Sequence, residues 1–68
     1  MHHHTNTIHL INQGDYYRID YDSQGEVRLV VRMPQHVNQK GNPVEWEDLQ
    51  PELQERITYR IFEEMTTL

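Results

Sequence analysis

The chain has 68 residues, no cysteine, 35% hydrophobic and 25% charged residues, and a formal net charge of −5 at pH 7. A chain of this length buries only about 60% of the surface that its unfolded form exposes, so a large enclosed substrate cavity is not expected. The absence of cysteine excludes a disulfide framework and a thiolate zinc site. The composition predicts one small domain over residues 1–68.

The N-terminal residues carry no signal for export. Residues 1–5, which include His2, His3 and His4, lack the apolar segment of a signal peptide. No stretch approaches the roughly 18 to 20 apolar residues that span a bilayer. We therefore expect a cytoplasmic protein with no membrane association. We interpret residues 1–6 as a disordered segment and not as a metal site.

Charge is distributed unevenly along the chain. Residues 1–42 hold four acidic and four basic side chains, whereas residues 43–68 hold seven acidic side chains against only Arg56 and Arg60. The acidic excess argues against general binding to a nucleic-acid backbone, because such binding usually requires a basic surface. It leaves protein partners open.

The first half of the chain predicts strands. From Ile8 to Met33 apolar residues alternate with polar ones, which is the period of half-buried strands. The alternating apolar residues are Ile8, Leu10, Tyr17, Ile19, Tyr21, Val27, Leu29, Val31 and Met33. Residues 12–15 and 22–25 separate the runs and are rich in turn-forming residues. Three antiparallel strands in a meander are therefore expected.

Turn chemistry indicates how the second and third strands pair. A loop of residues 23–25, with Gly25 in the left-handed conformation, pairs Tyr21 with Val27. Continued regularly, this register pairs Ile19 with Leu29 and Tyr17 with Val31, while the first turn pairs Leu10 with Tyr17 and Ile8 with Ile19. The opposite sheet face is then expected to carry His9, Ile11, Tyr16, Arg18, Asp20, Arg28, Val30 and Arg32.

A loop and one helix complete the predicted fold. Residues 34–43 are polar, non-periodic and bounded by prolines, which predicts a connecting loop. Pro51 suits the first turn of a helix that continues to about Thr66. Its apolar residues recur every four positions, at Leu53, Ile57, Ile61 and Met65, with Phe62 beside them. We expect an α+β domain, in which this amphipathic C-terminal helix packs on one face of a three-stranded antiparallel β-meander.

The residues offer little for catalysis. Ser23 is the only serine and lies in a predicted turn, so no activated nucleophile is indicated. The three glycines are too scattered for a phosphate-binding loop. His9 and His36 lack the spacing of a metal site. The stretch from Asp20 resembles the opening of a calcium-binding loop, but Val31 stands where that loop needs glutamate. We expect no enzymatic activity, no cofactor and no metal.

Two surfaces are candidates for binding. On the solvent side of the helix, an exposed tyrosine in an acidic field is a possible anchor for a basic protein partner; these residues are Tyr59, Glu52, Glu55 and Glu63. On the outer sheet face, arginines beside a tyrosine are typical of single-stranded nucleic-acid binding; these residues are Tyr16, Arg18, Arg28, Val30 and Arg32. We expect a small acidic protein-interaction module or inhibitor, and a nucleic-acid-binding sheet is the alternative.

The third predicted strand, residues 27–33, suggests self-association. In a three-stranded meander this strand is an edge with unpaired backbone groups. Val30 is expected on the face away from the helix, where a monomer gains nothing from it. Antiparallel pairing of two copies along this edge predicts a homodimer. Strand addition by another protein is the alternative use of the same edge.

Overall fold

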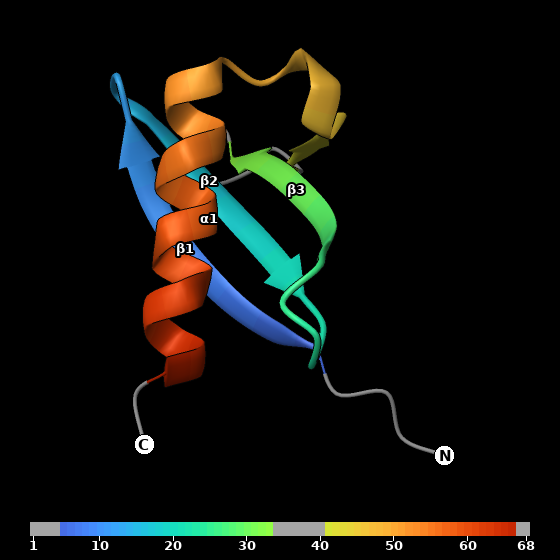
Figure 1. The fold of residues 1–68 in the computed structure, drawn as a ribbon. Helices are drawn as coiled ribbons and strands as arrows, with labels where there is room; N and C mark the ends of the chain where they lie inside the picture. Colours follow the sequence, from blue (N-terminus) through green and yellow to red (C-terminus); the bar gives the residue numbers. More distant parts are fainter. Residues whose placement is uncertain (1–4, 34–40, 67–68) are drawn as a thin grey trace.

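The computed structural model describes residues 5–33 and 41–66. Residues 1–4, with His2 to His4, and residues 34–40 of the predicted loop lie outside the described residues. The described chain forms one antiparallel sheet with one long helix packed on a single face (Figure 1). Within these residues, no helix is long and apolar enough to cross a membrane.

The sheet contains one strand more than the sequence predicts. Its order is β1-β2-β3-β4, and each strand is antiparallel to its neighbour. The bounds are Asn6–Asn12 for β1, Asp15–Tyr21 for β2, Val27–Met33 for β3 and Asn42–Pro43 for β4. β4 falls inside the predicted loop, because a strand of two residues is too short to show a periodic pattern.

The hairpin between β1 and β2 is regular. Its turn residues Gln13 and Gly14 have φ angles of 52° and 85°, as a type I′ turn requires. β1 begins at Asn6, inside the segment predicted to be disordered, and pairs with β2 along its whole length without a shift. The predicted pairs are confirmed, namely Leu10 with Tyr17 and Ile8 with Ile19.

The hairpin between β2 and β3 begins as predicted. Gly25 has a φ of 82°, and Tyr21 pairs with Val27. The side chain of Asp22 caps the turn, because its Oδ1 accepts hydrogen bonds from the amides of Gln24 at 2.9 Å and Glu26 at 3.0 Å. The predicted loop and its first strand pair are therefore confirmed.

Beyond that pair the predicted register is wrong. Arg28 is an extra residue in β3, so Asp20 pairs with Leu29 and Ile19 pairs with Val30. Such a β-bulge moves every later side chain of the strand to the opposite face. Val30, predicted on the outer face, is therefore 2% exposed in the core, whereas Leu29, predicted in the core, is 38% exposed.

β4 also changes the edge of β3. The prediction that β3 has an open edge is wrong for its C-terminal half, because Pro43 pairs with Val31 and Asn42 pairs with Arg32. The amide of Val44 then donates to the carbonyl of Val30 at 2.8 Å. A homodimer through this part of β3 would first require β4 to leave.

The core lies between the sheet and α1, Pro51–Thr66, which follows the 3-10 turn η1, Trp46–Asp48. The helix begins at Pro51 as predicted, and its buried stripe is Leu53, Ile57 and Ile61. These residues pack with Leu49 and with the inner face of the sheet, at Ile8, Leu10, Tyr17, Ile19, Tyr21 and Val30. Each aliphatic side chain among them, when fully buried, stabilises the fold by about 1.5 to 3 kcal/mol.

Two contacts position α1 on the sheet. Near its start, Nη1 of Arg56 donates to the carbonyl of Ile11 at 3.0 Å and to Oδ1 of the buried Asn12 at 2.7 Å. Near its end, Met65 lies against the β2–β3 turn, where a Cβ on Gly25 would lie 2.7 Å from its sulfur. Met65 is nevertheless 45% exposed, so its predicted place in the buried stripe is only partly realised.

Candidate functional site

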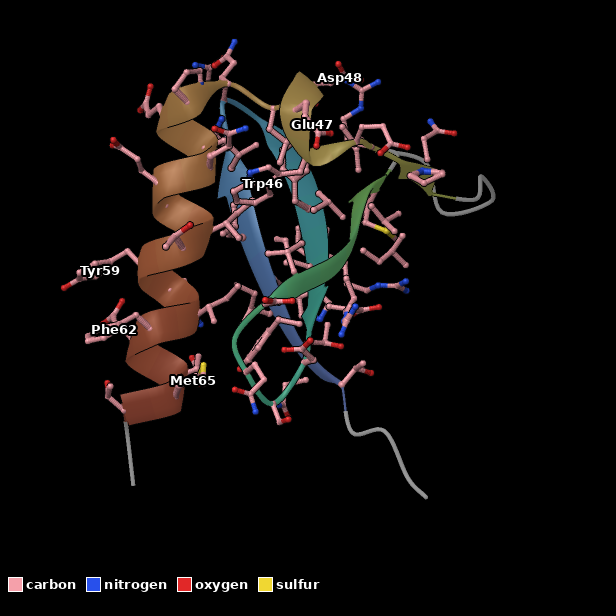
Figure 2. All side chains as sticks on the ribbon, turned by 45° about the vertical axis from the view of Figure 1, so that its right-hand side comes forward. Trp46, Glu47, Asp48, Tyr59, Phe62 and Met65 are labelled. Atoms are coloured by element: carbon pink, nitrogen blue, oxygen red, sulfur yellow. The ribbon has the colours of Figure 1, made fainter. Side chains whose placement is uncertain are left out.

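Helix α1 presents two neighbouring aromatic side chains to solvent. Tyr59 is 66% exposed and Phe62 is 64% exposed. Residues three apart are neighbours on a helix surface. Figure 2 shows both side chains pointing away from the sheet. They therefore lie on the side of α1 opposite the stripe that packs in the core.

A shallow apolar groove adjoins this pair. Its volume is about 520 Å³, and its lining residues are Trp46, Gln54, Glu55, Thr58, Tyr59 and Phe62. Trp46 is half-buried against the core, and Nε2 of Gln54 donates to its carbonyl at 2.7 Å. This hydrogen bond joins η1 to α1. We call Trp46, Tyr59 and Phe62 the aromatic patch.

Acidic side chains surround the aromatic patch. Glu55 and Glu63 lie one helical turn before and after Tyr59, and Glu52 lies two turns before it. All three are exposed. Glu47 and Asp48 of η1 are also exposed, but they line other depressions, Glu47 with Arg28 and Asp48 with Arg32 (Figure 2). We call Glu52, Glu55 and Glu63 the acidic rim; the structure thus brings the predicted residues Tyr59, Glu52, Glu55 and Glu63 onto one side of α1.

The two arginines of α1 have contacts of their own within the chain. Arg56 is bonded to the end of β1, as described above. Nε of Arg60 lies 3.1 Å from Oε1 of Glu64, an ion pair within the helix. Both arginines also line a groove with Tyr59 and Glu63, so one flank of Tyr59 is of mixed charge.

The second predicted surface is not assembled. Tyr16 and Arg18 lie on the sheet face away from α1, as expected, but Val30 lies in the core. Arg28 sits at the bulge, where its Nη2 lies 2.8 Å from Oδ2 of Asp22. The regular register would place Arg28 opposite Asp20 on the outer face, but Asp20 pairs with Leu29 instead.

Arg32 lies on the other face of the sheet. It pairs with Tyr17, whose side chain is in the core, so Arg32 is directed to the helix side. There it lines a small polar depression of about 240 Å³ together with Asp15 and Asp48. The bulge at Arg28 thus separates the three arginines of the predicted nucleic-acid surface.

The outer sheet face instead carries polar contacts and one apolar row. The hydroxyl of Tyr16 is hydrogen-bonded to Nδ1 of His9 at 2.8 Å, and the two rings stack with centroids 5.5 Å apart. Asp20 accepts a hydrogen bond from Thr7 at 2.8 Å and lies 3.7 Å from Nε of Arg18. The apolar row runs across the three long strands at Ile11, Tyr16 and Met33.

Asp22 has a structural role in the β2–β3 turn. The hydrogen bond from the Glu26 amide is the main cause that holds the pKa of Asp22 below its ordinary value of 3.8, and the Gln24 amide and Arg28 lower it further. All three partners belong to the same hairpin. The carboxylate therefore stabilises the turn and is not poised to transfer a proton.

The aromatic patch is only partly visible in the sequence. Phe62 was predicted beside the buried stripe, but at about 100° per residue it lies about 140° from Ile57, on the solvent side. A helical projection could have placed it. Trp46 joins the patch through the fold of η1, for which the sequence carries no comparable signal.

Comparisons of the chain with protein-family models, with curated proteins and with solved structures found no match. Within residues 5–33 and 41–66, no group of three or more histidine or acidic side chains is placed to hold a metal ion. The arrangement that remains is an apolar patch inside an acidic rim.

Proposed function

We propose that the protein is a small acidic interaction module, acting as an adaptor or inhibitor, that binds a basic partner protein through the aromatic patch. The observation that carries this proposal is the exposure of Tyr59 and Phe62 side by side on the solvent side of α1. The stripe of α1 on the other side already supplies the core. The exposed rings therefore add little to folding, whereas aromatic side chains are enriched at binding hot spots.

The acidic rim supports a basic partner. Glu52, Glu55 and Glu63 are exposed beside the rings, and the whole formal charge of −5 arises from residues 43–68. Such a rim attracts a basic surface during encounter and repels acidic ones, including nucleic-acid phosphates. The dispersed positions of Arg18, Arg28 and Arg32 give the nucleic-acid alternative no surface of its own, so we favour the protein partner.

A titration with two defined peptides tests this proposal. One probe is a synthetic amphipathic helix of leucine and lysine, and the other replaces each lysine with glutamate. We expect the lysine peptide to shift NMR amide signals of ¹⁵N-labelled protein around Glu55, Tyr59 and Phe62, and the glutamate peptide to leave them unchanged. Failure of the lysine peptide to bind at millimolar concentration, or equal binding of both peptides, would overturn the proposal.

Matched variants locate the contact. Tyr59→Ser and Phe62→Ser should each weaken the lysine peptide by about tenfold or more, because they remove the apolar anchor. Ile11→Ser is the control, since Ile11 is 61% exposed on the outer sheet face. Glu55→Lys should weaken binding mainly at low salt, because screening removes the effect of rim charges at high salt. A loss caused by Ile11→Ser alone would move the site to the sheet.

A further inference from the structure

Strand β1 is an edge of the sheet, and its own sequence lacks the residues that usually protect an edge against pairing. No described strand lies on the side of β1 away from β2. Its seven residues include no lysine, arginine, acidic residue, proline or glycine, and its register with β2 has no bulge. Natural edge strands of this length are usually blunted by such residues or by a bulge. This edge is therefore suited to accept another strand.

The backbone groups available along β1 follow from its hairpin. In a two-residue hairpin the pair that flanks the turn is hydrogen-bonded, here Asn12 with Asp15, and bonded pairs then alternate. The groups of Thr7, His9 and Ile11 consequently point away from β2. The carbonyl of Ile11 agrees with this, because it accepts a hydrogen bond from Arg56 of α1 and not from the sheet.

The sequence of β1 is nearly palindromic about His9. It reads Asn-Thr-Ile-His-Leu-Ile-Asn from residue 6 to residue 12. Antiparallel pairing with a second copy, with His9 opposite His9, places Asn6 opposite Asn12, Thr7 opposite Ile11 and Ile8 opposite Leu10. Ile8 and Leu10 would then meet on the helix side of the sheet, where apolar cross-strand pairs are favourable. The sequence of β1 is therefore compatible with antiparallel pairing to a second copy of itself.

The flank of α1 beside β1 carries charges of both signs. A groove of about 210 Å³ between the helix and β1 is lined by Leu10, Arg56, Tyr59, Arg60 and Glu63. A twofold axis through His9 brings this flank, which carries two arginines and one glutamate, toward its own copy. Side chains of both charges are therefore available on each side of such an interface.

We propose that two copies of the chain associate through their β1 edges, antiparallel about His9, and form one continuous sheet with both helices on the same face. The outward amide and carbonyl of each His9 bond to those of the other. The Ile11 carbonyl can accept a strand bond as well as the Arg56 bond, because it has two lone pairs. Tyr59 lines both the groove beside β1 and the groove beside Trp46 and Phe62. The dimer is nevertheless argued from the backbone edge of β1 and tested at His9, so it does not rest on the proposed function.

Charge substitutions at His9 test the dimer. Wild-type protein should show a concentration-dependent sedimentation mass that approaches twice the 8.3 kDa of one chain. His9→Lys and His9→Glu should each weaken self-association by about tenfold or more, because like charges then lie directly opposite. An equal mixture of the two variants should restore the dimer. Wild-type protein that sediments as a monomer from micromolar to millimolar concentration would overturn the proposal.

Two controls separate the interface from folding. Leu29→Lys places the same charge on the outer face of β3 and should leave the dimer unchanged, since Leu29 is exposed and far from β1 in the sheet order. Tyr16→Phe removes the hydrogen bond to His9 without adding charge, and this variant should also remain a dimer. A dimer that persists in both His9 variants would place the contact on another surface.

Amide hydrogen exchange provides a residue-level readout. Raising the protein concentration should protect the amides of Thr7, His9 and Ile11, which point away from β2. The amides of Ile8 and Leu10 bond to β2 in each copy, so their protection should not change with concentration. A dimer in which these alternate amides gain no protection would contradict strand pairing through β1.

Discussion

Strands β1 and β3 both pair with the central strand β2, yet their sequences relate differently to the structure. In β1 the buried apolar residues Ile8 and Leu10 alternate with exposed positions, and the register is regular. In β3 the run Leu29, Val30, Val31 is apolar on both faces, and the register shifts at Arg28. A slip of one residue in β1 would bring Thr7 and His9 into the core in place of Ile8 and Leu10. The same slip in β3 exchanges one apolar residue for another.

The bulge in β3 is favoured by contacts far along the chain. It places Val30 in the core beneath α1 and leaves Val31 buried on the outer face. The chain leading into β4 approaches Val31 so closely that a Cβ on Gly41 would overlap its side chain. The comparison shows that a one-sided strand pattern determines its own register, whereas a two-sided pattern leaves register to tertiary packing.

The largest expected effect on the free energy of unfolding comes from Ile57, where both hairpins contact α1. Ile57 is 0% exposed and packs in the core with residues of β1, β2 and β3. Ile57→Ala should lower the free energy of unfolding by about 2 to 5 kcal/mol, through lost burial and a residual cavity. Glu55→Ala on the solvent side should change it by less than about 0.5 kcal/mol. Urea unfolding curves that show equal losses would contradict the assigned helix face.

A second pair of substitutions tests the shifted register directly. Val30→Ala removes two methyl groups from a side chain that is 2% exposed and should cost about 1 to 3 kcal/mol. Leu29→Ala, at a position 38% exposed, should cost less than about 1 kcal/mol. The regular register expected from the sequence predicts the opposite order. Thermal or urea unfolding of the two variants therefore distinguishes the registers.

A smaller effect is expected at the attachment of α1 to β1. Arg56→Met keeps an unbranched aliphatic chain of similar length but removes the guanidinium group. That group donates hydrogen bonds to the Ile11 carbonyl and to the buried Asn12. Hydrogen bonds to a charged group contribute about 1.5 to 3 kcal/mol, so we expect a loss near the lower end of that range in unfolding experiments. Arg60→Met is the control, since its ion pair with Glu64 is exposed and contributes about 0 to 1 kcal/mol. Equal losses would deny Arg56 this role.

Much of the fold could be predicted from local signals. The turn residues and the alternation in β1 and β2 predict their hairpin, and Pro51 with the stripe of Leu53, Ile57 and Ile61 predicts α1. β4 could not be predicted, because Asn42 and Pro43 form a strand only through their pairing with β3. The bulge in β3 could not be predicted either, because it depends on contacts with segments far along the chain.

The candidate site shows the same division. Tyr59 and the glutamates of α1 could be predicted because helix periodicity alone places them toward solvent. The prediction of an arginine surface is wrong because it assumed a regular register for β3. In that register Arg28, Val30 and Arg32 would share a face, but the observed register is shifted. Trp46 joins the patch only because η1 packs beside α1. Positions within one element were predictable, whereas positions that depend on pairing between distant segments were not.

The smallest expected effect concerns the turn that precedes the bulge. In the folded state the pKa of Asp22 lies below its ordinary value of 3.8, chiefly because of the Glu26 amide. The unfolded chain therefore takes up a proton at higher pH than the folded chain. The stabilisation from this carboxylate is fully present above the ordinary pKa and is lost as the pH falls through the folded pKa.

Asp22→Asn should flatten this part of the acid dependence, measured as the free energy of urea unfolding from neutral pH to below 3.8. Arg28→Gln is the matched variant, because it removes the arginine that contacts Asp22 and leaves the amides of Gln24 and Glu26 in place. Since the Glu26 amide is the larger cause, Arg28→Gln should retain most of the acid dependence. NMR titration of the Asp22 carboxyl provides the direct measurement. A pKa at or above the ordinary value would contradict the hydrogen-bonded turn and, with it, the local geometry from which the bulge of β3 begins.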